Sequence, residues 1–352
     1  MKYVKLGNTG AFVSVLGFGA MTIGDKTVRN VGTGVGQEVS DKLIKLCIDK
    51  GINLFDTADV YDGGNSEVVL GKSLKDYRSQ VLIATKVRGR TGTGINEQGL
   101  SRRHMMIGLR NSMERLRTDW IDIYQYHGWD FQANVEEMIQ TMQFFVDQGL
   151  VIYPAFSNFT AWQMAYIQGI VEERGYAKYQ SAQVNYNLMS RDVEYEIIPF
   201  LKYSKMTLIS WSPLHGGLLS GKYRKGEEAP PGTRLGDGGY LPVFDEEKGW
   251  AIVNEVKRIA DELGVKPSQV ALSWLAEKNI VILISARNIE HLKEDIDSID
   301  IVLKREQVDR LNKISQRMSF ELMYPNWIIN KQNKHSTEGF NIVEAFRDNP
   351  SV

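Results

Sequence analysis

Only one cysteine, Cys47, occurs among the 352 residues, so the chain can form neither an intrachain disulfide framework nor a multi-cysteine metal cluster. No apolar run approaches the ~20 residues that a membrane-spanning helix needs. Lysine and arginine total 42 against 43 for aspartate and glutamate, so no broad charge favours nucleic acid or an anionic membrane. The N-terminal segment lacks the apolar core of a signal peptide, and we expect a cytoplasmic protein.

Signatures of metal sites and of classical dinucleotide folds are also scarce. The five histidines are His104, His127, His215, His291 and His335, and none lies at a close ligand spacing such as His-x-x-x-His. A weaker convergent set remains in Asp56, Asp59, His127 and Asp130, but we predict no metal. No Gly-x-Gly-x-x-Gly motif is present, since Gly32, Gly34 and Gly36 miss that spacing and indicate a flexible loop.

Apolar runs of strand length alternate with helical patterns along the chain. The strand candidates are Val15–Gly19, Asn53–Thr57, Val81–Lys86, Ile121–His127, Ile152–Ser157, Ala182–Asn185, Thr207–Ser212 and Ile280–Ser285. The helix candidates between and after them are Asp41–Lys50, Glu67–Leu74, Arg102–Arg117, Val135–Gln148, Ala161–Glu173, Val193–Ser204, Glu247–Leu263 and Ile289–Ile296. Suitable N-caps are Ser40, Ser66, Ser101, Asn134, Thr160 and Asp192.

These eight strand–helix units predict an α/β fold, the (β/α)8 TIM barrel. The strand runs are apolar on both faces, as expected for buried parallel strands. An open doubly wound sheet is the alternative, and the missing glycine motif weighs against it.

Several segments lie outside the regular repeat. Residues 2–13 predict an N-terminal β-hairpin at the bottom of the barrel, and residues 267–278 and 304–318 predict extra helices. Residues 88–100 and 213–244 are long and glycine-rich, so we interpret them as rim loops that bind or cover a ligand. We predict one domain over residues 1–352, with residues 319–352 as an irregular tail over the barrel.

Four polar residues close or closely follow three of the predicted strands: Asp56, Tyr61, Lys86 and His127. In a parallel barrel all strands end on the same rim, where active sites lie. Hydride transfer to a carbonyl requires that the developing oxyanion be stabilised and protonated. An ammonium next to a tyrosine favours its ionised form, a carboxylate holds the ammonium, and an imidazole orients the substrate oxygen.

Each of these residues alone has an ordinary structural interpretation, such as a cap, a packed phenol or a solvated ammonium. Their joint placement at three strand ends favours catalysis. A different barrel chemistry, a lyase or isomerase with Lys86 as a Schiff base, is also open. Pairing of Lys86 with Asp56 argues against it, because a charged lysine is a poor nucleophile.

Further motifs follow one another in a specific order. They are Leu16-Gly-Phe-Gly-Ala-Met21, Asn53-Leu-Phe-Asp-Thr-Ala58, Ser66-Glu-Val-Val-Leu-Gly71, Leu116-Arg-Thr-Asp-Trp-Ile-Asp122, Phe156-Ser-Asn-Phe159, Gln183-Val-Asn-Tyr-Asn187, Trp211-Ser-Pro-Leu214 and Ser220-Gly-Lys-Tyr223. Along nearly its whole length the chain resembles the aldo-keto reductase family, and within it the bacterial and potassium-channel β-subunit-like branch.

This resemblance implies that Asp56, Tyr61, Lys86 and His127 form a catalytic tetrad. It also implies a nicotinamide dinucleotide across the barrel rim, with Ser157, Asn158 and Gln183 on the carboxamide and Trp211 against the ring. The other cofactor contacts that it implies are Gly19, Ala20, Met21, Asp56, Ser212, Pro213, Leu214, Gly216 and Lys222. Tyr61, His127 and Trp129 would contact the substrate.

The adenosine end departs from the family pattern. Arg287 is placed to meet a 2′-phosphate, and His291 takes a position where the family usually has arginine or glutamine. Glu294 follows the pattern, but Asp295 replaces the usual asparagine, and its charge opposes a nearby phosphate. We predict NADP(H) over NAD(H), with a surface ion pair between Arg287 and Glu290 as the alternative for that arginine.

The sequence therefore predicts an NADP(H)-dependent oxidoreductase acting on a small aldehyde, ketone, alcohol or sugar derivative. Aromatic residues beside His127 and in the long loop and tail suit an apolar or sugar-like face of a substrate: Trp129, Tyr240, Phe320, Tyr324 and Trp327. Packing of the tail against the barrel is an equally good interpretation of the tail aromatics. The alternative is a cofactor-binding redox-sensing or regulatory subunit with little turnover. The sequence indicates a small-molecule partner, no nucleic acid and no membrane, and it leaves the oligomeric state open.

Overall fold

Eight parallel strands close into a barrel in the computed structural model, which describes residues 1–24, 27–28, 32–239, 241–242, 244–316 and 328. The order around the barrel is β10-β11-β12-β3-β6-β7-β8-β9. The strands are β3 (Leu16–Gly19), β6 (Leu54–Asp56), β7 (Leu82–Val87), β8 (Ile121–Tyr126), β9 (Val151–Ser157), β10 (Ser181–Asn185), β11 (Thr207–Trp211) and β12 (Val281–Ile284). Each predicted strand has its counterpart here.

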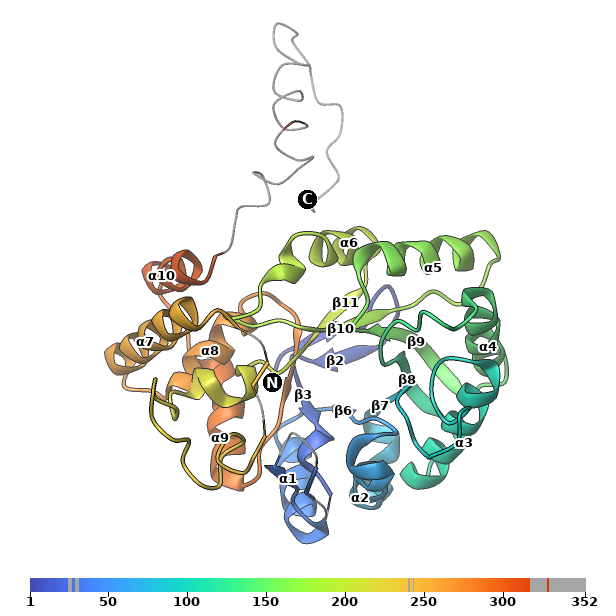
Figure 1. The fold of residues 1–352 in the computed structure, drawn as a ribbon, viewed down its shortest axis with the longest axis horizontal. Coiled ribbons are helices and arrows are strands. Elements are labelled where there is room, and N and C mark those ends of the chain that lie inside the picture. Colours follow the sequence, from blue (N-terminus) through green and yellow to red (C-terminus); the bar gives the residue numbers. More distant parts are fainter. Residues whose placement is uncertain (25–26, 29–31, 240, 243, 317–327, 329–352) are drawn as a thin grey trace, which may run out of the picture. The chain divides into compact units, whose positions relative to one another are not determined.

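Helices surround the strands, as Figure 1 shows, and confirm the (β/α)8 prediction. They are α1 (Gln37–Asp49), α2 (Asn65–Leu74), α3 (Arg102–Leu116), α4 (Val135–Asp147), α5 (Ala161–Glu173), α6 (Ile197–Tyr203), α7 (Glu246–Leu263), α8 (Pro267–Ala276), α9 (Ile289–Asp297) and α10 (Arg305–Ser315). Short 3-10 helices are η1 (Ala20–Thr22), η2 (Tyr61–Gly64), η3 (Lys75–Gln80), η4 (Asp192–Glu194), η5 (His215–Ser220) and η6 (Ser298–Asp300). The two extra helices predicted outside the repeat are α8 and α10.

Local hydrogen bonds explain where the helices begin. The side chains of Ser101 and Asn134 cap α3 and α4, and Thr160 forms a capping box at α5. Ser40 and Ser66 are not caps. Their helices begin three and one residues earlier, at Gln37 and Asn65, and both hydroxyls donate to backbone carbonyls instead. Asp192 is likewise not an N-cap but the first residue of η4.

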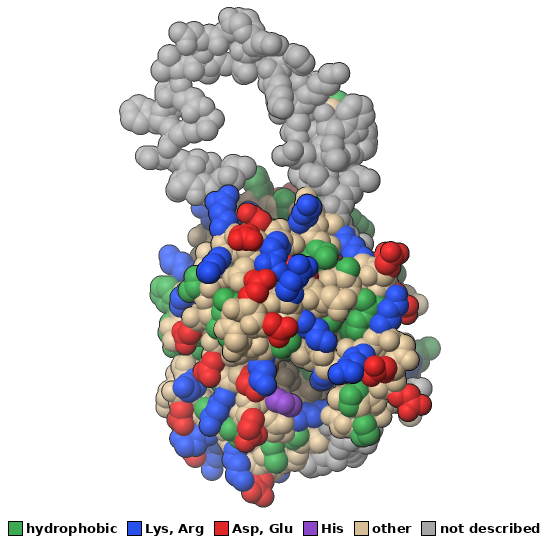
Figure 2. All heavy atoms as spheres, turned by 90° about the vertical axis from the view of Figure 1, so that its left-hand side faces the viewer, with side chains coloured by type: hydrophobic (Ala, Val, Ile, Leu, Met, Phe, Trp, Pro, Cys, Tyr) green, Lys and Arg blue, Asp and Glu red, His purple; other side chains and the backbone are tan. Residues whose placement is uncertain are grey.

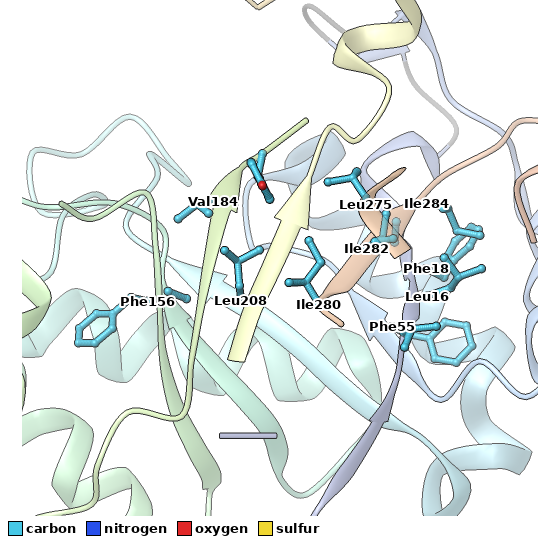
Figure 3. Close-up of a cluster of buried hydrophobic side chains, with 14 of the residues drawn as sticks. Leu16, Phe18, Phe55, Phe156, Val184, Leu208, Leu275, Ile280, Ile282 and Ile284 are labelled. Atoms are coloured by element: carbon cyan, nitrogen blue, oxygen red, sulfur yellow. The ribbon is translucent and has the colours of Figure 1, made fainter. Parts of the chain in front are cut away.

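The strands bury apolar side chains on both sides. Inward-facing residues fill the barrel interior, among them Leu54, Ala84, Ile123 and Ile209. Residues of opposite parity face the helices, and Figure 3 shows several of them, including Phe18, Phe55 and Phe156. Side chains alternate between the two faces of a strand, so every second residue faces the barrel interior. The inward-facing residues at the carboxyl ends follow from this alternation.

An N-terminal hairpin closes the bottom of the barrel. Strands β1 (Tyr3–Lys5) and β2 (Phe12–Ser14) pair antiparallel, as predicted. Leu6 and Val13 are fully buried against the interior residues of the barrel. The N–H of Gly7 donates to Thr207 Oγ1 at 2.7 Å, at the amino end of β11. The hairpin therefore seals the amino ends of the strands, and ligands have access from the carboxyl ends.

A second small ladder lies in the glycine-rich segment interpreted as a flexible loop. Strands β4 (Thr27–Val28) and β5 (Gly32–Thr33) pair antiparallel, and Ile23 and Val35 form an isolated bridge. Residues 27–28, 32–33 and 35 therefore take part in backbone pairing. Two-residue strands carry no amphipathic signal, so sequence periodicity does not reveal them.

Charges of both signs are mixed on the face that Figure 2 shows, in line with the balanced composition. Figure 2 shows blue and red side chains interspersed over the face that carries α7 and α10. No helix within the described part of the chain is both long and apolar enough to span a bilayer.

The backbone divides into two compact units, Met1–Ser315 and Gln316–Val352. The barrel belongs to the first unit. The tail predicted at residues 319–352 lies, except for Ile328, outside the described residues, as do Tyr240, Phe320, Tyr324 and Trp327. The single-domain organisation with a tail over the barrel therefore stays a prediction.

Candidate active site

Polar side chains form the top layer of the barrel interior. Each lies two residues beyond an inward-facing apolar residue of its strand: Asp56 after Leu54, Lys86 after Ala84, Gln125 after Ile123, Ser157 after Ala155, and Trp211 after Ile209. Side chains two residues apart on a strand point to the same face, so these side chains also face inward, at the carboxyl ends of their strands. The alternation that builds the core thereby gathers the site on the rim where barrels carry active sites.

Lys86 is the centre of this layer. Its side chain is fully buried, and its ammonium donates to Asp56 Oδ1 at 2.6 Å, to the Thr57 carbonyl at 2.7 Å and to Tyr61 Oη at 3.3 Å. Burial lowers the pKa of the ammonium, but the Asp56 and Tyr61 oxygens outweigh it and hold that pKa above its usual value. Lys86 is therefore charged, and all three of its protons are used.

Asp56 accepts three side-chain hydrogen bonds. Its Oδ1 accepts from Lys86, and its Oδ2 accepts from Gln183 Nε2 at 2.7 Å and from Gln125 Nε2 at 2.9 Å. Burying an ion pair costs several kcal/mol per ion unless good hydrogen bonds compensate. The two glutamines supply that compensation. Gln125 was not among the predicted site residues, because nothing in the sequence around a strand glutamine indicates a functional role.

Tyr61 opens η2, five residues after Asp56, and its ring packs edge-on against His127 with centroids 5.8 Å apart. Burial raises the pKa of the Tyr61 phenol above its usual value, and the Lys86 charge opposes this without reversing it. The pKa of the Tyr61 phenol is therefore shifted upward, whereas an adjacent ammonium alone would shift it downward. The phenol therefore keeps its proton, with Lys86 donating to its oxygen.

His127 follows β8 and carries a neutral ring over the physiological pH range. Burial, with the charges of Lys86 and Arg88, lowers the pKa of its imidazole to about 3. Its backbone N–H donates to the Val87 carbonyl, and its own carbonyl accepts from Asn158 Nδ2 at 3.0 Å. A neutral imidazole can orient a substrate oxygen, but it is not a proton source at neutral pH.

The predicted carboxamide and ring contacts lie next to His127. Asn158 has left-handed φ of 57° and joins three partners through its amide: the His127 carbonyl, Ser157 Oγ and Trp211 Nε1, which donates to Asn158 Oδ1 at 3.0 Å. Gln183, predicted to contact the carboxamide, here donates to Asp56 and to Gln125 Oε1. The structure thus brings these residues to one side of the rim.

The turn after β11 has a left-handed backbone conformation and a lysine packed against it. Ser212, His215, Gly216 and Gly217 all have positive φ, and the Gly216 N–H donates to Ser212 Oγ at 3.0 Å. An added Cβ on Gly217 would lie 2.9 Å from the Lys222 ammonium, so that ammonium sits directly on the turn. Pro213 is buried and Leu214 half-buried in the same segment.

The end of β3 forms the neighbouring part of the rim. Gly19 pairs with Asp56 in the sheet, and Ala20 and Met21 follow in η1. The Ala20 carbonyl accepts from Ser66 Oγ at 2.7 Å, which ties η1 to α2. These three predicted contacts therefore adjoin Asp56.

The residues predicted for the adenosine end also gather. Arg287 pairs with Asp237 of the long 213–244 loop at 3.1 Å, and not with Glu290. Burial and the Arg287 charge lower the pKa of Lys222, which also interacts with Asp295 and Arg234. Burial, with Glu294, raises the pKa of Asp295 to about 7.

His291 lies one turn into α9. Its backbone N–H donates to the capping side chain of Asn288 at 2.8 Å, and its imidazole is exposed. The exposed ring leaves a face for an adenine base.

Trp129, predicted to contact substrate, is half-buried and belongs to an aromatic group beyond His127 in which Phe159 is buried and Trp162 exposed. Its ring packs against Phe159 and Trp162 with centroids 5.5 and 5.6 Å apart. Trp162 was not foreseen because it lies on α5, far along the chain. Among the residues that the structure describes, no three His, Cys, Asp or Glu side chains come close enough together to hold a metal ion.

A closed parallel barrel with a buried lysine–carboxylate pair, a tyrosine and a histidine at its carboxyl rim is the architecture of a barrel oxidoreductase. A sequence model described as the aldo/keto reductase family matches residues 15–316. The chain belongs to the aldo/keto reductase family.

Its relatives carry names of two kinds. A probable voltage-gated potassium channel subunit beta of Oryza sativa subsp. japonica is 32% identical, with 90% of this chain and 97% of that protein covered. The versiconal hemiacetal acetate reductase of Aspergillus parasiticus is 31% identical, with 89% and 96% covered. An aldo-keto reductase of Alternaria alternata is 31% identical, with 88% and 90% covered.

Proposed function

We propose that the protein is an NADP(H)-dependent oxidoreductase that transfers hydride between the nicotinamide and a small carbonyl or alcohol substrate. The observation that carries this proposal is the bonding of Lys86. Because Lys86 donates to Tyr61 Oη, the phenol uses its oxygen as an acceptor and keeps its own proton for another partner. That proton is available to an oxygen placed above the rim.

The rim residues fit a nicotinamide dinucleotide. The positive-φ turn at Gly216 and Gly217 uses its own backbone amides internally, and the side chains of Lys222 and Arg234 lie against it. Two cations side by side form charge-assisted hydrogen bonds with a pyrophosphate. Asn158, Ser157 and Trp211 supply amide, hydroxyl and ring surfaces for the carboxamide and the nicotinamide. Arg287 and His291 are the groups that would meet the 2′-phosphate and the adenine.

A nicotinamide held by these rim residues would provide the hydride, with its electron pair, for the carbonyl carbon. Tyr61 then donates its proton to the carbonyl oxygen as negative charge develops there, so that an aldehyde becomes an alcohol. Lys86 stabilises the phenolate left behind, and Asp56 holds Lys86 in place through the 2.6 Å contact. The neutral His127 ring, packed on Tyr61, orients the substrate oxygen. In the oxidative direction Tyr61 accepts the proton.

The Schiff-base alternative for Lys86 has little support. A nucleophilic lysine must be neutral and free to approach a carbonyl. The ammonium of Lys86 is fully buried, has a raised pKa and is bound to three oxygens. The half-buried ring of Trp129, which packs on the buried Phe159, favours a substrate with a flat or apolar face beside its carbonyl.

Turnover with a simple carbonyl tests the proposal. We expect the purified chain to oxidise NADPH when 4-nitrobenzaldehyde is added, followed as loss of absorbance at the reduced-nicotinamide band. Similarity to channel β-subunits supports the second candidate, a cofactor-binding redox-sensing subunit. Tight NADPH binding with negligible turnover across a panel of aldehydes, ketones and alcohols would favour that candidate. Failure to bind either nicotinamide cofactor would exclude both.

Asp295 should weaken the preference for NADPH. Its pKa of about 7 means that it gains negative charge as the pH rises through 7, near Lys222. We expect Asp295→Asn to lower the KM for NADPH several-fold at pH 8 and to change it little at pH 6, because wild-type Asp295 is mostly protonated there. NADH, which lacks the 2′-phosphate, serves as the control cofactor at both pH values.

Arg287→Ala should act in the opposite direction, raising the KM for NADPH at both pH values. Comparing each variant with wild type at the same pH cancels the ionisation of the phosphate itself. An unchanged NADPH preference in Arg287→Ala would reject its assignment to the 2′-phosphate.

A further inference from the structure

A cavity of about 220 Å³ lies beside the tetrad but contains none of the residues predicted to hold cofactor or substrate. Its walls are η2, the 88–100 loop and one face of α3. It has room for roughly seven water molecules at ~30 Å³ each, so it suits a small polar ligand.

Two buried side chains at this cavity have polar atoms without partners. Asp59 is 2% exposed; its carboxyl group interacts with the neighbouring Val60 backbone, and within the described part of the chain neither oxygen has a partner at full hydrogen-bond geometry. His104 is also 2% exposed; its ring bonds to the Gly89 backbone, and its Nε2 has no partner there. Native structures satisfy most such groups, since leaving them unpaired costs free energy.

Three guanidinium groups line the same cavity. Arg115 is bonded to Glu67 at 2.7 Å, and Arg90 donates to carbonyls of its own loop, including that of Gly92 at 3.3 Å. Arg103 is exposed and has no ion pair among the described residues. Glu97 is the opposing charge in the lining, and its carboxylate accepts from the Gly94 N–H. The lining therefore has an excess of cations.

The protonation state of Asp59 fits this picture. Burial and the Glu67 charge raise the pKa of Asp59 to about 8, against the opposing charges of Arg115 and Lys86. At neutral pH the group is mostly a carboxylic acid, which donates one hydrogen bond and accepts others. His104 Nε2 is an acceptor, because burial lowers the pKa of the imidazole and keeps the ring neutral. The buried end thus suits hydroxyl groups.

We propose that this cavity is a second binding site, for a small hydroxylated anion such as a polyol phosphate. Hydroxyls would meet Asp59 and His104, and the anionic group would meet Arg103 and Arg90. The occupant would also contact Gly63, in the turn that follows Tyr61. That turn has positive φ at Asp62, Gly63 and Gly64, so a ligand against it braces the segment that carries the phenol.

Calorimetric titration of the full-length protein tests the site with three probes: glycerol 3-phosphate, inorganic phosphate and glycerol. We expect saturable binding of glycerol 3-phosphate that is tighter than that of either fragment. Arg103→Ala should weaken this binding at least ~10-fold, because a charge-assisted hydrogen bond is lost. Arg110→Ala is the matched control, since Arg110 is exposed on the same helix and does not line the cavity.

Asp59→Leu should weaken the binding of glycerol 3-phosphate by a similar factor and leave the affinity for inorganic phosphate nearly unchanged. If that variant does not fold, the Arg103 and Arg110 pair still decides the question. The double variant Lys222→Ala/Arg287→Ala should bind as wild type does, because those cations belong to the rim. The proposal is overturned if glycerol 3-phosphate does not saturate the protein, or if Arg103→Ala and Arg110→Ala bind it equally well. It is also overturned if only the double variant loses binding.

Discussion

Tyr61→Phe is expected to lower kcat for carbonyl reduction by about 10²- to 10⁴-fold, the range that a positioned general acid contributes. The ring of phenylalanine preserves the packing against His127, whose centroid lies 5.8 Å away. The only group lost is the hydroxyl that accepts from Lys86 and donates to substrate. The measurement is steady-state turnover with the best aldehyde of the panel, together with the Kd for NADPH, which should change little.

Tyr124→Phe is the matched control for this substitution. Tyr124 is fully buried on β8, and within the described residues its hydroxyl has no hydrogen-bond partner. Removing that hydroxyl breaks no contact, so kcat should stay within about twofold of wild type. Wild-type turnover in Tyr61→Phe on every accepted carbonyl would falsify the assignment of Tyr61 as the acid.

Lys86→Met should reduce both activity and stability. The substitution leaves the Asp56 carboxylate buried without its counter-charge, which costs about 3–5 kcal/mol of unfolding free energy. Without the ammonium, the phenolate formed during reduction loses its stabilising charge, and kcat should fall at least ~100-fold. Urea denaturation midpoints and steady-state kinetics measure the two effects separately.

The double variant Asp56→Asn/Lys86→Met distinguishes charge burial from packing. It removes both charges, so we expect it to regain most of the stability lost in Lys86→Met while remaining inactive. Lys178→Met is the surface comparison, because Lys178 and Glu172 form an exposed ion pair worth less than about 1 kcal/mol. A double variant as unstable as Lys86→Met would show that the unpaired carboxylate is not the cause.

Strand periodicity predicted the parts of the site that lie on strands. Asp56 and Lys86 end apolar runs whose alternation fixes an inward direction, and the closed barrel places both on one rim. Tyr61 and His127 follow those strands so closely that they cannot lie far from the rim. The barrel, its hairpin and its extra helices were predictable for the same reason, since each depends on local periodicity.

Contacts set by tertiary packing were not predictable. Gln125 supports Asp56 only because β8 and β6 both face the same interior, and its sequence context is ordinary. The partner of Arg287 is Asp237, fifty residues away in a loop, and not the neighbouring Glu290. Ser66 resembles a helix cap, yet its hydroxyl reaches the Ala20 carbonyl on another strand's end. Such choices depend on the assembled fold and not on sequence spacing.

The hairpin that closes the barrel has a consequence during protein synthesis. Gly7 bonds to Thr207, 200 residues later in the chain. Ribosomes add ~5–20 residues per second, so roughly 10–40 s pass between translation of the two. Throughout that interval Leu6 and Val13 have no finished interior to enter, although both are fully buried in the end. The hairpin is thus made well before the strands that shield it from water, and nascent-chain chaperones have that long to meet it.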